Sequence, residues 1–491
     1  MIPLSLGEIA QVVGGRLVGA DPAAVASGPL EFDSRKVARG GLFLALAGEH
    51  VDGHDFVDAA IRQGAVAALV TRPVPAPSIE VADGFAALAA LAGTVVRRLP
   101  DVTVVGITGS SGKTSTKDLL AQLLARLGPT VAPPGSFNNE LGHPYTVLLS
   151  DERTRFLVLE TSARGIGHIR YLAEIAPPRI GVVLNVGSAH LGEFGSREAI
   201  AQAKGELVEA LPPAADGGVA VLNADDQLVL AMRSRTAARV VTFGEARSAD
   251  VRADGVEFDE LGRPAFTLHA AGGSGRVQLR VVGGHQVGNA LAAAAAALEC
   301  GMPLPDVAAG LAEAAPVSRW RMELTERPDG VLVINDAYNA NPESMRAALK
   351  ALAAVSRPRR ERGGRSFAVL GPMAELGPDG PAEHDALGRL AVRLDVSRLI
   401  AVGEQARPIQ HGAALEGSWN GESSWVPDID AAIAMLRAEL RPGDVVLVKA
   451  SRAASLERVA LAVADDATGT AATGTPATGK AATDRSGGGT A

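Results

Sequence analysis

The segment spanning residues 101–127, DVTVVGITGSSGKTSTKDLLAQLLARL, constrains the fold of this chain more than any other. Residues 102–107 form an apolar, β-branched run, which predicts a buried strand. A turn rich in glycine and serine follows at residues 108–114. Leucines then recur at helical spacing as far as Gly128-Pro129, so we expect a helix that begins after the turn and ends there.

A strand, a glycine-rich turn and a helix in this order predict a phosphate-binding loop. Unpaired amides at the start of a helix point toward an anion, and the helix dipole favours negative charge there. We expect Lys113 to reach the outer phosphates of a nucleotide and the Thr114 hydroxyl to bind magnesium. The longer motif G-x-x-x-x-G-K-[ST] would need glycine at Ile107, so only G-x-x-G-K-T is present. The alternative is a Gly/Ser loop that contains a lysine by chance, and the flanking strand and helix favour the nucleotide site.

Composition limits the classes of protein to consider. A length of 491 residues predicts about three domains, and 47% hydrophobic residues are typical of globular domains with ample cores. The net charge of −8 provides no basic face, which argues against nucleic acid as a partner.

Cys300 is the single cysteine, so no internal disulfide forms, and this fits a reducing compartment. The N-terminus does not read as a signal peptide, and no apolar run approaches the roughly 20 residues of a membrane span. We therefore expect a cytoplasmic protein without membrane insertion.

Patterning divides the chain into three domains and a tail. Residues 1–98 predict a small α/β domain. Residues 99–315 alternate strands with helices, which predicts a central parallel sheet with helices on both faces, and residues 238–283 predict a small antiparallel appendage to it. Residues 316–463 repeat the alternation and predict a Rossmann-like α/β domain. Residues 464–491 are Ala/Thr/Gly repeats and predict a disordered, low-complexity tail.

Three predicted strands of the central domain lead into polar residues. These are Glu160, Asn185 with His190 close behind it, and the run Asn-Ala-Asp-Asp at residues 223–226. Ligands bind outside the carboxyl ends of strands in open α/β sheets, so these groups can converge beside the glycine turn. Glu160 is either a magnesium ligand, directly or through water, or a strand-end carboxylate that faces solvent. His190 is either functional or structural.

Other polar residues also leave two interpretations open. Lys204 lies on a predicted helix and would ordinarily be a solvated surface lysine. Ser34 and Arg35, after a turn, either bind a polar ligand or are solvated. Asn289 precedes an alanine-rich helix and is either its cap or a contact to a nucleotide base. Asn341 is expected to cap a helix that starts with proline.

Taken together, the motifs resemble those of the Mur ligases of bacterial cell-wall synthesis. The shortened turn TGSSGKT is that family's form of the phosphate-binding loop. Further family motifs follow in order: DSR (33–35), DGHDF (52–56), FNNELGHPYTVL (137–148), NVGSAHLGEFGSREAIAQAKGE (185–206), NADD (223–226) and GHQVGNALAA (284–293). The segment DAYNANPESM (336–345) is typical of the branch that adds D-alanyl-D-alanine. The resemblance covers roughly residues 25–460.

The resemblance implies an ATP-dependent amide ligase that uses ATP and Mg²⁺. Its substrates would be UDP-N-acetylmuramoyl-tripeptide, bound by the first domain, and D-alanyl-D-alanine. ATP would phosphorylate the terminal carboxylate of the tripeptide, and the dipeptide amine would then attack the activated carbonyl. The protein would supply positioning and electrostatics rather than a nucleophile, and closure of its domains would exclude water. We expect the enzyme to be a monomer.

The resemblance also implies roles for individual residues. ATP would contact Thr108, Gly109, Ser110, Ser111, Gly112, Lys113, Thr114, Asn289, Arg321 and Asp336. The metal ions would be bound by Thr114, Glu160, His190 and Lys204, with Lys204 carbamylated so that it becomes a carboxylate-like ligand. The substrates would contact Ser34, Arg35, His54, Asn138, Asn139, Tyr338 and Asn339. The catalytic residues would be Lys113, Lys204, His190 and Arg321. Arg319 is a rival for the role of Arg321, because tryptophan precedes Arg321 where the family usually has glycine.

Two other classes remain as alternatives. One is a sister amide ligase, which adds a diamino acid at the preceding step, or a folylpolyglutamate synthase. The diamino-acid-adding type usually carries Asp-Asn-Pro-Arg, which this sequence lacks. The other is a nucleotide-switch binding module, but the Asn-Lys-x-Asp motif that GTPases use for guanine is also missing.

Overall fold

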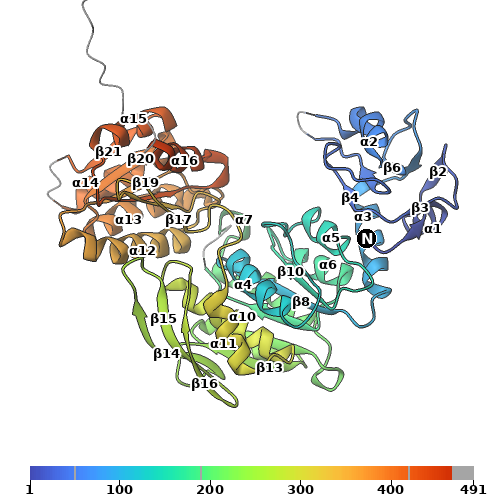
Figure 1. Cartoon of the computed structure of the whole chain (residues 1–491), viewed down its shortest axis with the longest axis horizontal. Helices are drawn as coiled ribbons and strands as arrows, with labels where there is room; N and C mark the ends of the chain where they lie inside the picture. The colour runs from blue at the N-terminus through green and yellow to red at the C-terminus, as the bar shows by residue number, and fades with distance from the viewer. Residues whose placement is uncertain (49–50, 188–190, 418–420, 467–491) are drawn as a thin grey trace, which may run out of the picture.

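The chain folds into three α/β domains. A computed structural model describes residues 1–48, 51–187, 191–417 and 421–466. The N-terminal domain, blue in Figure 1, and the C-terminal domain, orange to red, lie on either side of a central domain that contains the largest sheet. The predicted α/β class and the three-domain organisation are confirmed.

The N-terminal domain is built on a five-stranded mixed sheet. Its order is β2 (Arg16–Val18), β7 (Ser78–Glu80), β6 (Ala67–Val70), β5 (Leu42–Leu44), β4 (Leu30–Glu31), and only β2 runs antiparallel to its neighbour. A separate ladder pairs β1 (Leu4–Ser5) with β3 (Val25–Ala26), and the helices are α1 (Leu6–Val12), α2 (Val57–Gln63) and α3 (Gly84–Arg97). The Ser5 side chain accepts a hydrogen bond from the Glu8 amide and caps α1.

The central domain has a nine-stranded sheet whose middle strand carries the glycine turn. In order across the sheet the strands are β16 (Gly273–Gln278), β15 (Pro264–Ala270), β14 (Val251–Phe258), β13 (Arg239–Gly244), β12 (Val219–Asn223), β11 (Ile180–Val183), β8 (Thr103–Thr108), β10 (Phe156–Glu160) and β9 (Thr130–Val131). The strands from β9 to β14 pair in parallel, and β15 and β16 are antiparallel additions. The predicted parallel sheet is therefore confirmed.

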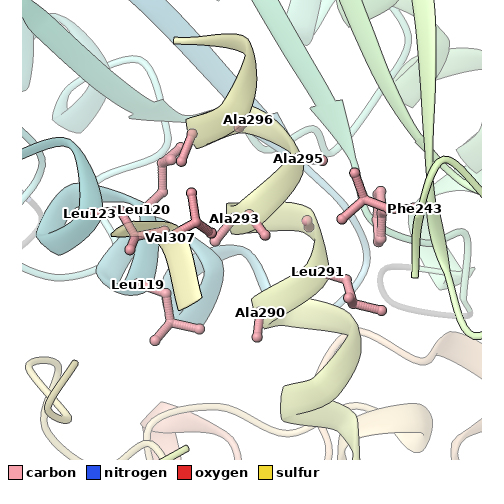
Figure 2. Packing of buried hydrophobic residues seen from close by; sticks show 14 of the residues in the cluster. Leu119, Leu120, Leu123, Phe243, Ala290, Leu291, Ala293, Ala295, Ala296 and Val307 are labelled. Atoms are coloured by element: carbon pink, nitrogen blue, oxygen red, sulfur yellow. The ribbon is translucent and has the colours of Figure 1, made fainter. Parts of the chain in front are cut away.

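Helices cover both faces of the central sheet because the strand side chains alternate. Val105 and Ile107 of β8 pack with α4 (Lys113–Ala125), α10 (His285–Glu299) and α11 (Leu304–Glu313), whereas Val104 faces the other way. The opposite face carries α5 (Gly142–Val147), α6 (His168–Ile175), α8 (Arg197–Glu209) and α9 (Gln227–Leu230), and α7 (Leu191–Phe194) is a short helix before α8. Figure 2 shows the leucines of α4 on one side of α10 and Phe243 on the other.

The predicted antiparallel appendage at residues 238–283 is wrong in part. Strand β13 pairs in parallel with β12 and belongs to the central sheet. Strand β14 was not identified from the sequence; it pairs in parallel with β13 at its start and antiparallel with β15. The antiparallel strands thus extend the large sheet rather than forming a separate unit. A short apolar run has the same pattern in either pairing, so the sequence alone did not distinguish them.

The C-terminal domain has a six-stranded sheet in the order β17 (Glu323–Glu326), β18 (Leu332–Asn335), β22 (Val445–Lys449), β19 (Ser366–Leu370), β20 (Arg398–Val402), β21 (Ser423–Val426). Only β17 is antiparallel to its neighbour. One face is covered by α12 (Pro342–Arg360), α13 (Gly380–Arg393) and α14 (Arg407–Glu416), and the other by α15 (Ile429–Glu439) and α16 (Glu457–Asp465). Asn341 caps α12 and Pro342 is its first residue, as predicted.

Two further features concern the end of the chain and its helices. Helix α16 continues to Asp465, past the predicted start of the tail at residue 464, because Val459, Ala460 and Val463 are buried against the sheet. The predicted tail from residue 467 onward lies outside the described residues. Within the described part of the chain, every helix is too short or too polar to span a lipid bilayer.

Candidate active site

The glycine turn lies between the carboxyl end of β8 and the start of α4. Gly112, the residue before α4, has a φ of +84°, in the left-handed region that favours glycine. A Cβ atom at this position would also collide with the Asn289 side chain. The Lys113 Nζ atom donates a hydrogen bond to the Gly109 carbonyl, 2.7 Å away, so this side chain folds back over the turn.

Asn185, at the end of the neighbouring strand, fixes the first half of the turn. Its Oδ1 accepts a hydrogen bond from the Ser111 amide at 2.9 Å, and its Nδ2 donates to the Ser111 carbonyl at 3.2 Å. The Ser110 hydroxyl accepts a hydrogen bond from the Gly187 amide at 2.9 Å. These hydrogen bonds tie the turn to the segment that follows the neighbouring strand.

Polar groups from three segments meet at the start of α4. The Thr114 hydroxyl lies 3.3 Å from Ser136 Oγ and 3.3 Å from Glu160 Oε2. Ser136 Oγ itself donates to Glu160 Oε2, and Asn138 Nδ2 lies within hydrogen-bond distance of both. The structure thus brings Thr114 and Glu160 together, as expected from the sequence, and adds Ser136 and Asn138.

Glu160 is fully buried, which resolves the open question of its environment: it does not face solvent. Burial raises the pKa of its carboxyl group, and the positive charges of Lys117, Lys113 and Arg321 oppose that shift. Its Oε1 atom is buried and has no hydrogen-bond partner among the described residues. An oxygen atom in this position, beside a threonine hydroxyl and a phosphate-binding turn, is suited to a divalent cation.

Magnesium needs few protein ligands. It is usually bound by one or two carboxylates together with water and substrate phosphates. Among the described residues, no group of three or more His, Cys, Asp or Glu side chains gathers to hold a metal ion. The donor set of Glu160 and Thr114 beside the turn fits that mode of binding.

Lys204 is buried in α8 and is not a solvated surface lysine. Burial lowers the pKa of its amine far below the ordinary value, and the nearby Lys113 cation lowers it further. A buried lysine with a lowered pKa, close to a phosphate-binding turn, is typical of a functional site rather than of a solvated surface. His190, the other predicted residue of this region, lies outside the described residues.

The C-terminal domain reaches the turn through Arg321. One Nη atom of Arg321 donates to the Thr114 hydroxyl at 3.3 Å, and its guanidinium lies 4.3 Å from the centre of the Tyr338 ring. The backbone has positive φ on both sides of it, 59° at Trp320 and 52° at Met322, which turns the arginine toward the central domain. Arg319, the rival from the sequence, is exposed, and no contact between it and the turn is recorded.

Asp336 follows β18 and forms a buried ion pair with Lys449, the last residue of β22, at 2.6 Å. The other Asp336 oxygen accepts a hydrogen bond from the Met322 amide at 3.1 Å. Lys449 also donates to the Asn339 carbonyl at 2.8 Å, and burial lowers its pKa despite the neighbouring carboxylate. Lys449 thus anchors the loop that carries Tyr338 and Asn339.

Two cavities meet at the turn, and Arg321 lines both. The larger, of about 470 Å³, is lined by residues of the turn with Asn138, Asn139, Tyr338 and Asn339. The smaller, of about 190 Å³, is lined by Gly112, Asn185, Asn289, Asp336 and Lys449 among others. The predicted nucleotide and dipeptide residues therefore line two cavities that share Gly112 and Arg321 between the central and C-terminal domains.

Asn289 does not cap a helix. It lies in the second turn of α10, which begins at His285 rather than at residue 290. The prediction that Asn289 caps this helix is therefore wrong. Its Oδ1 lies 3.4 Å from the Thr116 hydroxyl and its Nδ2 donates to Gln286 Oε1 at 2.9 Å. The remaining interpretation is a ligand contact, because Asn289 borders the smaller cavity.

The predicted residues of the N-terminal domain lie in two different environments. His54 is buried; its Nδ1 lies 2.6 Å from Asp52 Oδ1, and its Nε2 accepts a hydrogen bond from the Thr71 amide at 3.0 Å. Both ring nitrogens are therefore engaged inside the domain. Arg35 is exposed and pairs with Asp33 at 2.9 Å, and Ser34 is half-buried beside it. None of these side chains lines the two cavities at the turn.

The run at residues 223–226 stabilises the scaffold. Asp226 caps α9 and accepts a hydrogen bond from the Val186 amide, and Asn223 donates to the Leu184 carbonyl. Asp225 accepts hydrogen bonds from the Glu245 and Ala246 amides. These residues hold strand ends in register beside the turn.

The sequence analysis missed several residues of the site. Ser136 lies in a loop, and nothing in its local pattern marked it. Lys117 is fully buried one helical turn after Lys113, and its Nζ donates to the Pro133 carbonyl at 2.9 Å, which ties the loop before Ser136 to α4. The apolar spacing of the helix could have indicated this lysine, because it falls on the buried face.

These features define the class: a multidomain enzyme whose phosphate-binding loop lies against a second α/β domain. Three family models match in order, described as Mur ligase family, catalytic domain (residues 30–96), Mur ligase middle domain (107–297) and Mur ligase, glutamate ligase domain (320–452). The chain belongs to the Mur ligase family.

Within the family, one named sequence relative and two solved structures are similar to nearly the whole chain. A Mycobacterium tuberculosis protein named UDP-N-acetylmuramoyl-tripeptide–D-alanyl-D-alanine ligase is 55% identical, over 96% of this chain and 99% of that one. A crystal structure of MurF from Acinetobacter baumannii has a TM-score of 0.82 and 32% identity, covering 94% of this chain and 99% of that one. MurF ligase from Thermotoga maritima in complex with ADP has a TM-score of 0.76 and 30% identity, covering 91% and 99%.

Proposed function

We propose that this chain joins D-alanyl-D-alanine to the terminal carboxylate of UDP-N-acetylmuramoyl-tripeptide, with ATP hydrolysed to ADP and phosphate. The product is UDP-N-acetylmuramoyl-pentapeptide, a precursor of peptidoglycan. The observation that carries the proposal is the cavity of about 470 Å³ in which the phosphate-binding turn faces Tyr338 and Asn339 of the C-terminal domain. The names of the relatives support the choice of substrates.

The reaction proceeds through an acyl phosphate. A carboxylate oxygen of the tripeptide attacks the γ-phosphorus of ATP, and the bond from that phosphorus to the bridging oxygen of ADP breaks. The dipeptide amine then attacks the acyl carbon, phosphate leaves with the carboxylate oxygen, and the amine loses a proton. Lys113, which donates to the turn, and Arg321, which donates to the Thr114 hydroxyl, stabilise the negative charge on the transferred group.

Magnesium would be held by Thr114 and Glu160, whose oxygen atoms fit it. When bound, the ion neutralises charge on the transferred phosphoryl group. Ser136 and Asn138 hydrogen-bond to the same Glu160 oxygen and orient the carboxylate. The partnerless Glu160 Oε1 supports this assignment.

Lys204 is proposed to be carbamylated. Its neutral amine would attack carbon dioxide, form an N–C bond and release one proton, and the product is a carboxylate on a buried side chain. This would replace an amine whose protonated form Lys113 repels with an anion that a second magnesium attracts. His190 is proposed as a further ligand of the metal ions.

The remaining assignments are proposals of the same kind. Residues 1–98, with Ser34, Arg35 and His54, would bind the UDP-muramoyl part of the substrate, residues 99–315 would bind ATP, and residues 316–463 would complete the ligase site. Asn289 and Asp336 would contact the nucleotide from the walls of the smaller cavity. Asn138 and Asn139 would contact the tripeptide. The reaction would take place in the cytoplasm, and the enzyme would be a monomer.

The test is ADP release from ATP with UDP-N-acetylmuramoyl-tripeptide, measured with and without D-alanyl-D-alanine. We expect turnover only when the dipeptide is present, with one amide bond for each ADP. Turnover that ignores the dipeptide, or that occurs only with a diamino acid and the shorter UDP-linked acceptor, would reject this function in favour of a sister ligase.

A further inference from the structure

A single peptide group of the turn is held from two domains. The peptide that joins Ser110 to Ser111 presents its carbonyl to Asn341 Nδ2, at 3.1 Å, and its N–H to Asn185 Oδ1, at 2.9 Å. Asn185 belongs to the central domain, whereas Asn341 belongs to the C-terminal domain. The peptide lies between two asparagine side chains that come together only when the two domains are in contact.

The chemistry of its partners fixes the orientation of the Asn341 amide. Its Oδ1 accepts a hydrogen bond from the Ser344 amide at 2.8 Å, in the capping box of α12. A backbone N–H can only donate and a carbonyl can only accept, so Nδ2 must face Ser110. Asn341 is buried, with 8% of its surface exposed. One half of this side chain therefore caps a helix, and the other half contacts the phosphate-binding turn.

This contact completes the hydrogen bonding of Ser110. The Ser110 amide donates to the Asn185 carbonyl at 3.1 Å, its hydroxyl accepts from the Gly187 amide, and its carbonyl accepts from Asn341. Phosphate binding by such a turn depends on the direction in which each amide points. Without Asn341, the side-chain partner that remains for the Ser110–Ser111 peptide, within the part of the chain that the structure describes, is Asn185 on the N–H side.

We propose that Asn341 is a positioning residue that couples the seating of the C-terminal domain to the geometry of the phosphate-binding turn. Tyr338 and Asn339 lie just before Asn341 in the loop that borders the larger cavity. The same loop that meets the incoming amine thus aligns the turn that transfers the phosphoryl group. Phosphoryl transfer is efficient only when the loop is in place to use the acyl phosphate. This inference rests on the proposed function.

The test separates this role from that of an ordinary helix cap. Asn341→Asp and Asn341→Ser both keep an oxygen that can cap α12, but neither keeps the amide that donates to Ser110. Asp428→Ala is the matched control, because it removes an N-cap of α15 in the same domain, on an exposed side chain outside both cavities. For each variant we would measure the melting temperature, kcat, KM for ATP, and the ratio of ADP released to amide formed.

We expect kcat to fall roughly tenfold to a hundredfold in both Asn341 variants, while the melting temperature stays close to that of the parent. The ratio of ADP to amide should rise above one, because water then reaches an acyl phosphate that is formed without a seated loop. In Asp428→Ala the melting temperature should fall and the ratio should stay at one.

Parent values of kcat and of the ratio in both Asn341 variants would overturn the inference. So would loss of folding in both variants, since Asn341 would then be a structural cap. If the parent enzyme itself shows no dependence on the dipeptide, the proposed function fails instead, and the two failures are thereby distinguished.

Discussion

The surroundings of Lys113 disfavour the protonated form of its amine. Burial lowers the pKa of its amine, Glu160 opposes this shift and Arg321 adds to it, and together they bring the pKa to about 8. A bound triphosphate would add negative charge and favour the protonated form. Among the described residues the Lys113 amine donates to the Gly109 carbonyl, at the turn where the phosphates of a nucleotide would lie.

Replacement of Lys113 by alanine should lower turnover by at least about 10²-fold, because the transferred group loses a positive charge in a site shielded from water. The measurement is dipeptide-dependent ADP release at saturating substrates. Lys350→Ala, which removes an exposed lysine of α12, should leave the rate unchanged. Equal effects of the two substitutions would remove Lys113 from the mechanism.

Lys204 permits a chemical rescue experiment. If its function is that of a carbamate, Lys204→Ala should be nearly inactive, and short carboxylic acids such as acetate should restore part of the activity by occupying the space of the lost carboxylate. Rescue is measured as ADP release against acid concentration, with a short alkylamine as the control. Rescue by the amine alone, or an unaltered rate in the variant, would contradict the carbamate.

The reactivity of the Cys300 thiol measures how well a side chain outside the site is shielded from solvent. Burial raises the pKa of its thiol to about 12, so at pH 8 it contains roughly 10³-fold less thiolate than an ordinary cysteine. Alkylation by iodoacetamide at pH 8 should therefore be at least a hundredfold slower in the folded enzyme than in urea. The rates are followed by mass spectrometry of the intact chain. Equal rates would show that the thiol is not shielded.

At the scale of elements, helix α10 shows what small residues permit. Ala290 to Ala297 are fully buried, and the helix lies between α4 and the sheet, with Phe243 on the sheet side in Figure 2. Side chains as small as alanine allow these three layers to approach closely, and the same packing brings Asn289 against Gly112. The alanine-rich composition of α10 thus determines where Asn289 lies in the wall of the smaller cavity.

Ala293→Leu should therefore lower the free energy of unfolding by about 1–3 kcal/mol, because the added carbons have no space. The control is Ala309→Leu on the neighbouring helix α11, where the side chain is exposed and the change should stay within about 0.5 kcal/mol. Urea denaturation followed by circular dichroism measures both. A stable Ala293→Leu variant would mean that α10 is packed more loosely than described.

The elements show where sequence reasoning succeeds and where it stops. The strand, turn and helix around Lys113 were predicted because each has a strong local pattern, and strand ends placed Glu160 and Asn185 correctly beside the turn. Strand β14 and the parallel pairing of β13 were missed, because pairing partners are a property of tertiary structure and not of a short apolar run. The hydrogen bond from Asn341 to the Ser110 carbonyl crosses a domain boundary, so the spacing of neighbouring residues in the sequence could not predict it.

At the scale of the whole molecule, the C-terminal domain is anchored to the helix that begins at the phosphate-binding turn. Gln122 of α4 hydrogen-bonds both to the amide and to the carbonyl of Ala315, and Asp118 accepts from the Ser318 amide. Farther out, Arg164 and Glu375 form an exposed ion pair across the same boundary at 3.5 Å. Contacts in the linker and at the turn thus hold the two walls of the site together.

This arrangement accounts for a ligase that needs no nucleophilic side chain. In the proposed reaction both reacting groups belong to substrates, and the role of the domains is to bring them together and to keep water away. The central claim is therefore that the tripeptide carboxylate itself receives the phosphoryl group between Lys113 and the loop of Tyr338.

The most direct measurement follows the oxygen atoms of that carboxylate. The enzyme would be given ATP, D-alanyl-D-alanine and UDP-N-acetylmuramoyl-tripeptide whose terminal carboxylate carries a heavy oxygen isotope, and the released phosphate would be analysed by mass spectrometry. If the tripeptide carboxylate receives the phosphoryl group, we expect one labelled oxygen in the phosphate for each amide bond formed. Amide formation accompanied by unlabelled phosphate would contradict it.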